Sequence, residues 1–243
     1  MSLPASDTST PTLPRTPSKA VSVLSKKPSN ACFGGVVTIE VGAEKKAFVI
    51  HKDLLSYYSD FFRAVFNGSF KESVERKLCL VHEDVDVFDI FNAFVYTNQL
   101  RDKNGVIGKD LSTFMLVRLW LFGDKHLVPA LQNAAADALM ERMAEYDKWC
   151  HNAMPFIYDQ TIDGSPLRRL MIDSQVHRAA CNKDHLAKWP QEALVDLAMA
   201  FSDRTPTSRR ALLDEEVSYR KTCTGGKSQE FDHNLWFHPR PTA

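Results

Sequence analysis

Residues 47–56 of the chain are AFVIHKDLLS, residues 59–66 are SDFFRAVF and residues 70–73 are FKES. The first four residues favour a β-strand, and the hydrophobic period changes at Lys52. After this point apolar side chains recur at helical spacing, at Leu54, Tyr58, Phe61, Phe62 and Val65. A strand therefore passes directly into two short helices.

Local signals divide these helices. Ser59 precedes the second aromatic cluster and is predicted to cap a helix there, since a serine hydroxyl can accept a hydrogen bond from a free N–H of the first turn. Asn67-Gly68 is a turn signal that ends this helix.

Strand patterns flank this stretch. Val37, Ile39 and Val41 alternate with polar residues, and Gly42 then opens a turn toward residues 47–50, so the spacing predicts a β-hairpin. A third short apolar run, at Leu78, Leu80 and Val81, predicts another strand.

Helical patterns dominate the rest of the first 145 residues. We expect Asp86 to cap a helix with an apolar stripe, Leu111 to Phe122 to form a second helix, and Val128-Pro129 to start a third. The stripes predicted to face inward are Val87, Ile90, Phe91, Phe94 and Val95; Leu111, Phe114, Met115, Leu119 and Phe122; and Leu131, Ala135, Ala138, Leu139 and Met143. Early strands followed by helices indicate an α+β fold.

The ordered set of motifs over residues 31–144 resembles the BTB/POZ domain. The matching features are His51-Lys52, the Ser59 to Phe62 helix with Phe66, the FNAFVYT stretch at residues 91–97, and LWLFGDKHL at residues 119–127. The resemblance implies a small, mainly three-stranded sheet covered by helices. It also implies that the fold depends on His51, Lys52, Phe61, Phe62, Phe94 and Tyr96, with the His51 ring bonding local backbone.

Two further helices are predicted after residue 145, one from Ser165-Pro166 and one from Trp189-Pro190. In the second, Leu194, Leu197, Ala198 and Phe201 are expected to face inward. The segment WPQEALVDL at residues 189–197 resembles the helical extension of the fungal BTB subset. We expect residues 145–202 to form an extension docked on the preceding domain, residues 1–30 to be a disordered Ser/Thr/Pro-rich tail, and residues 203–243 to be a polar, partly disordered tail.

The family resemblance implies a non-enzymatic module that binds other proteins as a scaffold or adaptor. The expected contact surface is Phe66, Phe70 and the 111–122 helix, with Glu72 and Arg118 as polar contacts at its rim. In family members that serve as adaptors of cullin-based ubiquitin ligases, a hydrophobic-x-Glu element follows the aromatic helix, and Phe70-Lys71-Glu72 fits it. The alternative is that Phe70 only covers the edge of the core.

Self-association is left open by the resemblance. Many dimerising members carry an aspartate before the first strand that pairs with a basic residue after the histidine. Here Gly35 takes the place of the aspartate, so Lys52 is expected to be solvated.

Composition limits the other classes of function. Hydrophobic residues make up 44% of the 243 residues, so a packed core is expected. Lys plus Arg and Asp plus Glu number 30 each, and a formal net charge of +0 provides no long-range attraction for nucleic acid or an anionic membrane. No stretch approaches the roughly 20 apolar residues of a membrane span. Five scattered cysteines favour an intracellular protein, in the cytoplasm or nucleus.

Candidate chemistry is sparse. Cys181 and His185 have a helical spacing suited to two metal ligands, and Cys150-His151 lies upstream, so a small metal protein or enzyme is retained as the alternative class. The main prediction is no cofactor, no metal and no catalytic residue. Phe231, Trp236 and Phe237 lie in the polar C-terminal tail and either dock in cis or bind a partner in trans.

Overall fold

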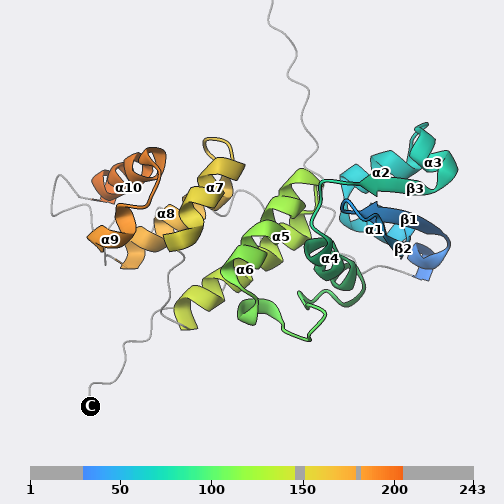
Figure 1. The fold of residues 1–243 in the computed structure, drawn as a ribbon, viewed down its shortest axis with the longest axis horizontal. Helices are drawn as coiled ribbons and strands as arrows, with labels where there is room; N and C mark the ends of the chain where they lie inside the picture. The colour runs from blue at the N-terminus through green and yellow to red at the C-terminus, as the bar shows by residue number, and fades with distance from the viewer. Residues whose placement is uncertain (1–29, 146–150, 179–181, 205–243) are drawn as a thin grey trace, which may run out of the picture. The chain divides into compact units, whose positions relative to one another are not determined.

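The computed structural model describes residues 30–145, 151–178 and 182–204 (Figure 1). The chain divides into two compact units, unit 1 within Met1–Ala138 and unit 2 within Leu139–Ala243. We predicted the end of the first domain at residue 144, and the units divide earlier, inside a helix. The predicted tails, residues 1–30 and 203–243, lie almost entirely outside the described residues.

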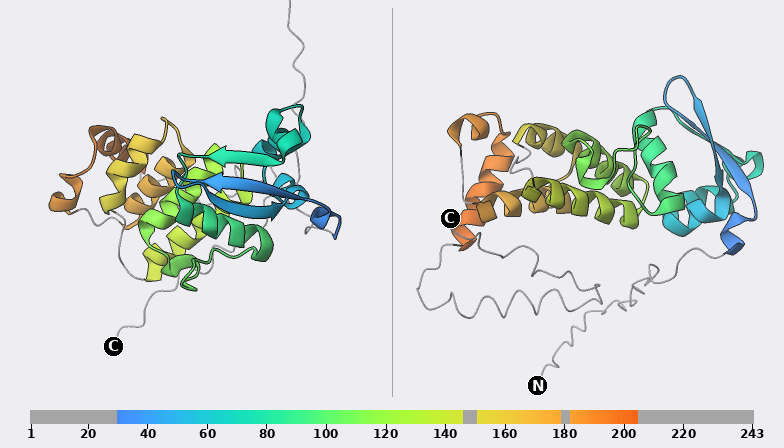
Figure 2. Two further views of the ribbon diagram at one scale, coloured as in Figure 1. Left: turned by 45° about the vertical axis from the view of Figure 1, so that its right-hand side comes forward. Right: turned by 90° about the horizontal axis from the view of Figure 1, so that it is seen from below.

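Unit 1 contains one three-stranded sheet with the order β2-β1-β3, and Figure 2 shows the strands side by side. β1 (Val36–Val41) pairs antiparallel with β2 (Lys46–His51) and parallel with β3 (Lys77–Leu80). Val37, Ile39 and Val41 are buried, as the alternating pattern predicted. The third strand is confirmed, although it ends at Leu80 and leaves Val81 exposed.

The turn between β1 and β2 requires glycine at its first position. Gly42 has a φ of +76°, and a Cβ atom there would lie 2.9 Å from Cγ2 of Val85. Any L side chain at Gly42 would therefore strain the backbone and also clash with the side chain of Val85.

Three short helices follow β2: α1 (Lys52–Tyr58), α2 (Asp60–Asn67) and α3 (Lys71–Glu75). Ser59 caps α2, because its hydroxyl accepts a hydrogen bond from the N–H of Phe62 at 3.0 Å. The same hydroxyl donates to the carbonyl of His126 at 2.7 Å, so the cap also ties α2 to a distant segment. The predicted cap and the predicted end at Asn67 are both confirmed.

Helix α4 (Val85–Thr97) starts earlier than predicted. Asp84, not Asp86, is the N-cap: its Oδ1 accepts hydrogen bonds from the N–H groups of Asp86 and Val87, at 2.8 and 3.3 Å. The prediction of Asp86 was wrong because both aspartates suit a cap, and the alternating acids of this segment do not distinguish the two frames. The predicted apolar stripe of α4 is buried.

Unit 1 continues with α5 (Thr113–Lys125) and enters α6 (Pro129–Glu145). The face predicted for α6 is buried. On α5 the prediction was partly wrong: Phe114 is 43% exposed, whereas Leu116, Val117 and Trp120 are buried. Leu111, Leu119 and Phe122 are buried as predicted. Phe114 lies about 200° around the helix from Leu116, and because both sides of α5 are apolar, periodicity alone misplaced Phe114.

Aromatic rings form the centre of unit 1. Phe62 and Phe91 stack with ring centroids 5.9 Å apart, and Phe91 contacts Phe122 at 5.0 Å. Phe62, Phe88 and Phe91 are completely buried. Burial of each such side chain contributes about 1.5–3 kcal/mol to folding, so this cluster joins α2, α4 and α5 into one core.

Unit 2 is helical in its described part. It contains α7 (Met154–Gln160), α8 (Pro166–Arg178), α9 (Lys183–Leu186) and α10 (Gln191–Arg204). Short 3-10 turns complete the chain at Asn30–Phe33, Gly108–Asp110 and His151–Ala153. The helices predicted from Ser165-Pro166 and Trp189-Pro190 are confirmed, and docking of residues 145–202 on the preceding domain stays a prediction.

The inward side of α10 differs from the prediction. Leu197 is 5% exposed, as predicted, and Ala193 is 0% exposed. Phe201 is half-buried. Leu194 is 36% exposed and Ala198 is also exposed, so their predicted inward orientation was wrong. Both sides of α10 carry apolar residues, and only the packing against α8 and α7 selects between them.

Candidate protein-interaction surface

The corner between α2 and α3 is anchored in the core. Phe66, near the end of α2, is 3% exposed. Its carbonyl oxygen accepts a hydrogen bond from the hydroxyl of Ser73 on α3, at 3.0 Å. Phe66 was predicted to contact a partner, but its side chain is packed inside unit 1 and serves to hold this corner in place.

Gly68 controls the position of the next aromatic residue. A Cβ atom at Gly68 would lie 2.6 Å from the carbonyl oxygen of Ala64 and 3.0 Å from Cδ2 of Phe70. The ring of Phe70 therefore occupies space that only a glycine leaves open. Phe70 itself precedes the first turn of α3 and is 57% exposed.

Helix α3 buries none of its own residues. Val74 is 84% exposed, and Glu72 is half-buried. We call Phe70, Glu72 and Val74 the α3 surface. It places two large apolar side chains and one carboxylate within five consecutive residues, which suits contact with another protein more than contact with water.

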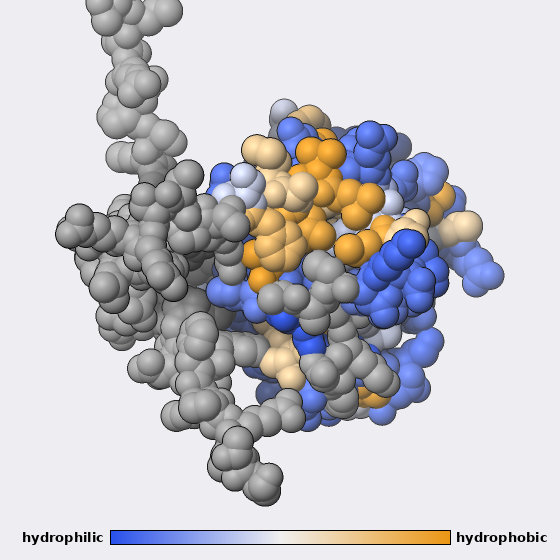
Figure 3. All heavy atoms as spheres, turned by 90° about the vertical axis from the view of Figure 1, so that its left-hand side faces the viewer, coloured by the Kyte–Doolittle hydropathy of each residue, from blue (hydrophilic) through white to orange (hydrophobic). Residues whose placement is uncertain are grey.

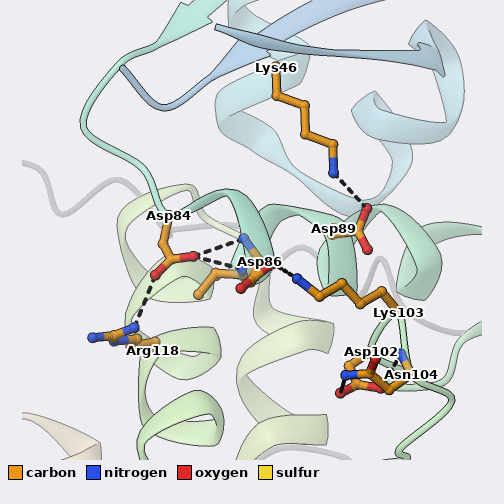
Figure 4. A network of polar contacts seen from close by, with 9 residues as sticks. Lys46, Asp84, Asp86, Asp89, Asp102, Lys103, Asn104 and Arg118 are labelled. Atoms are coloured by element: carbon orange, nitrogen blue, oxygen red, sulfur yellow. Dashed lines mark hydrogen bonds and ion pairs between the residues drawn. The ribbon is translucent and has the colours of Figure 1, made fainter. Parts of the chain in front are cut away.

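Arg118 belongs to a different polar network (Figure 4). Its guanidinium pairs with Oδ2 of Asp84 at 3.0 Å, while the other oxygen of Asp84 caps α4. The structure thus connects α5 to the start of α4 through Arg118. The predicted combination of Arg118 with Phe70 and Glu72 in one surface remains a prediction, since the ion pair of Arg118 points to α4.

Further exposed ion pairs surround α4. Lys103 pairs with Asp86 at 3.0 Å, and Lys46 lies 3.7 Å from Asp89 (Figure 4). The hydrogen bond with Asp86 raises the pKa of Lys103. Exposed pairs of this kind contribute about 0–1 kcal/mol to stability, so neither pair decides the fold of unit 1.

His51 is bound to a side chain, not to the local backbone that the family resemblance implied. Its Nδ1 lies 2.9 Å from the hydroxyl oxygen of Tyr96, and its backbone N–H donates to the same oxygen at 3.2 Å. The end of β2 is therefore joined to α4. Lys52 is partly exposed, and its Nζ lies 3.8 Å from Oδ1 of the neighbouring Asp53. The backbone N–H of Lys52 donates to the carbonyl oxygen of Gly35.

The remaining residues tied to the fold by the family resemblance lie where a core requires them. Phe62 and Phe94 are 0% and 1% exposed. Phe61 is half-buried and contacts the ring of His126 at a centroid distance of 5.0 Å. Phe62 stacks on Phe91, so these side chains join α2 to α4.

A set of polar contacts around the largely buried Glu83 was not recognised in the sequence. Nε2 of His126, which is 3% exposed, lies 3.1 Å from Glu83, and Lys125 donates to the same carboxylate at 2.5 Å. Burial works to raise the pKa of Glu83, but the hydrogen bonds from His126 and Lys125 outweigh it and lower the pKa to about 2. Residues 83 and 126 are far apart in the sequence, so no local pattern could have identified this pair.

Metal-ligand chemistry has limited support. The rings of His151 and His185 are in contact, with centroids 4.1 Å apart, while Cys150 and Cys181 lie outside the described residues. Within residues 30–145, 151–178 and 182–204, no group of three or more His, Cys, Asp or Glu could hold a metal ion. In the same part of the chain, no helix is long and apolar enough to span a bilayer.

Comparison with known proteins agrees with this geometry. The family model of the BTB/POZ domain matches residues 36–125, which include the whole sheet, α1 to α5, and the α3 surface. No curated protein matches the chain. The three-stranded sheet, the aromatic core and the family match lead to one conclusion: residues 36–125 form a BTB/POZ domain.

Proposed function

We propose that the chain is a non-enzymatic adaptor or scaffold that binds another protein through the α3 surface of its BTB/POZ domain. The observation that carries this proposal is the exposure of Phe70 and Val74, at 57% and 84%, at the N-cap and within a helix that has no fully buried residue. Removing each side chain from water in a complex would contribute about 1.5–3 kcal/mol before the costs of association.

A more specific candidate is the adaptor of a cullin-based ubiquitin ligase. Its support is the Phe70-Lys71-Glu72 element, in which Phe70 is exposed and Glu72 is half-buried beside it. Phe70 would act as an apolar anchor, and Glu72 as a charged contact at the rim. Residues 165–202 would then serve as a fungal-type extension that captures a substrate.

Self-association and location complete the proposal. Gly35 provides no carboxylate for Lys52, whose near neighbour is Asp53, so a homodimer would need contacts other than that ion pair. Cys32 and Cys79 are free thiols in the described part of the chain, which fits an intracellular protein in the cytoplasm or nucleus.

The test is affinity purification of the tagged full chain from its native cell, with the bound proteins identified by mass spectrometry. Phe70→Ala combined with Val74→Ala should reduce recovery of the main partner about tenfold, because the variant removes both apolar anchors. Ile162→Ala is the control, since Ile162 is 83% exposed on unit 2 and lies outside the expected contact surface. Undiminished recovery from a folded Phe70/Val74 variant would overturn the proposal.

The cullin candidate has its own outcome in the same experiment. Stoichiometric cullin that disappears with Phe70→Ala combined with Glu72→Ala would support it. Cullin capture that survives this change in a folded protein would show that the element is ordinary packing at the edge of the core.

A metal protein is the alternative from another class, and the contact between His151 and His185 is its support. Zinc measured well below one equivalent per chain after native purification would remove that support. About one equivalent, lost on substitution of His151 and His185, would favour it over the adaptor.

A further inference from the structure

Helix α10 exposes a second apolar surface, on unit 2. Leu194, Val195 and Met199 are 36%, 53% and 58% exposed, and Ala198 between them is exposed as well. We call these four residues the α10 outer face. Figure 3 views the molecule from the side on which α9 and α10 lie in Figure 1, and hydrophobic residues form a patch on the described surface.

Polar contacts along one edge of α10, between its buried side and the outer face, fix the rotation of the helix. Arg168 of α8 donates to Glu192 at 3.1 Å, and the hydroxyl of Tyr158 on α7 donates to Asp196 at 2.6 Å. Ala193 and Leu197 form the buried side. Rotating α10 to bury the outer face would break both contacts, so the helix cannot cover Val195 and Met199 by itself.

The chain contains an apolar segment C-terminal to α10, separated from it by residues 205–230. Helix α10 stops at Arg204, and residues 205–230 are mostly polar or charged. Residues 231–237 are FDHNLWF and contain four large apolar side chains, at Phe231, Leu235, Trp236 and Phe237. Aromatic residues of this kind are the usual anchors of a buried contact.

The length of the connection permits this segment to return to α10. The distance from Arg204 back to Leu194 along the helix is about 15 Å, at 1.5 Å per residue. A polar chain as long as residues 205–230 has a root-mean-square span of about 28 Å without being stretched. A segment held on such a linker has an effective concentration in the millimolar range, well above that of a separate partner in most cells.

We propose that residues 231–237 pack onto the α10 outer face of the same chain. Phe231, Leu235, Trp236 and Phe237 cover Leu194, Val195, Ala198 and Met199, and this contact closes an apolar face that α10 cannot bury by rotation. The contact is independent of the α3 surface, since the two involve different units and different residues.

Photo-crosslinking of the full chain tests this contact. Met199 is replaced by p-benzoylphenylalanine, the purified protein is irradiated at low micromolar concentration, and the products are mapped by mass spectrometry. We expect a cross-link within one chain to residues 231–237, at a yield that does not change on dilution. Trp236→Ala combined with Phe237→Ala should lower this yield about tenfold.

Two controls make the result specific. Leu213→Ala removes an apolar residue from the connecting segment and should leave the yield unchanged. The same photoreactive residue at Val74, which is 84% exposed on unit 1, should not cross-link to residues 231–237.

Other products would overturn the proposal. A cross-linked dimer whose yield falls on dilution would identify a second copy as the occupant of the α10 outer face. Cross-links to residues 30–138, or to residues 211–219, would identify a different segment of the chain. No cross-link above the level of the Val74 control would show that this face is not occupied in the free protein.

Discussion

The guanidinium of Arg168 lies over the ring of Tyr158, 4.3 Å from its centroid, and Arg168 also donates to the carbonyl oxygen of Tyr158 at 2.8 Å. Only 7% of Arg168 is exposed. The hydroxyl of Tyr158 in turn donates to Asp196, and burial together with this hydrogen bond raises the pKa of Tyr158. Two residues thus connect α7, α8 and α10 and determine which side of α10 faces solvent.

Arg168→Met should lower the free energy of unfolding of unit 2 by about 3 kcal/mol, because it leaves the carbonyl groups of Tyr158 and Thr161 without their donor inside the unit. Thermal and urea denaturation followed by circular dichroism measure the change. Arg169→Met, at the exposed neighbouring position, is the control and should cost less than about 0.5 kcal/mol. Equal effects of the two variants would contradict a structural role for the network.

Glu83→Gln should destabilise unit 1 in a way that depends on pH. The pKa of Glu83 is lowered in the folded protein to about 2, from an ordinary value of 4.5. The stabilisation by the carboxylate is therefore fully present above pH 4.5 and is lost as the pH falls through 2. We expect a difference of about 2 kcal/mol from the unsubstituted protein at pH 7, after allowance for solvent screening, and a smaller one at pH 3.

Urea unfolding at the two pH values measures this difference. Glu44→Gln, at an exposed position in the turn between β1 and β2, should change the free energy of unfolding only slightly, and by the same amount at pH 3 and pH 7. A Glu83→Gln effect that is equally large at pH 3 and pH 7 would show that the carboxylate charge is not what stabilises the fold.

Gly68→Ala should destabilise unit 1 by about 1–3 kcal/mol and displace the ring of Phe70, since the new Cβ atom meets the carbonyl oxygen of Ala64 at 2.6 Å. Gly35→Ala is a close control, because a Cβ atom there meets nothing within 4 Å. Differential scanning fluorimetry of the two variants measures the difference. If both have the same melting temperature, the close packing of Phe70 over Gly68 does not contribute to stability.

His151 should stay neutral at mildly acidic pH. Burial, and then repulsion from His185, lower its pKa to about 4 from 6.5. For a base with a lowered pKa, the folded state favours the neutral form, so stability is greatest above pH 6.5 and falls as the pH decreases toward 4. NMR titration of the imidazole signals gives the midpoint directly.

The neighbouring histidine provides the matched variant for this titration. His185→Gln should move the midpoint of His151 upward, because it removes the repulsion between the two rings. His82→Gln, which changes an exposed histidine in unit 1, should leave it unchanged. A midpoint near 6.5 in the unsubstituted protein would show that His151 is not buried against His185.

Much of unit 1 could be predicted because its signals are local. The alternation at Val37, Ile39 and Val41 and the cap at Ser59 each depend on a few neighbouring residues. The same holds for Pro129 at the start of α6. Phe70 could be identified as a candidate contact from its motif. Val74 and Gly68 were missed, since the exposure of α3 and the close approach of the Phe70 ring result from the way this corner folds back.

By itself the sequence determined the order of the three strands and of the longer helices, the change of period at Lys52 and the resemblance to the BTB/POZ domain, because backbone propensity and capping act over a few residues. The short helices α3, α7 and α9 were not predicted. Only the tertiary structure decided that β3 pairs parallel with β1, that Asp84 and not Asp86 caps α4, and that Leu194 and Val195 of α10 face outward. The pairing of β3 and the outward side of α10 depend on partners distant in the sequence, and Asp84 has a distant partner in Arg118 besides the local N–H groups that it caps. Where two faces or two caps are locally equivalent, the packing and hydrogen bonds of the folded chain select one of them.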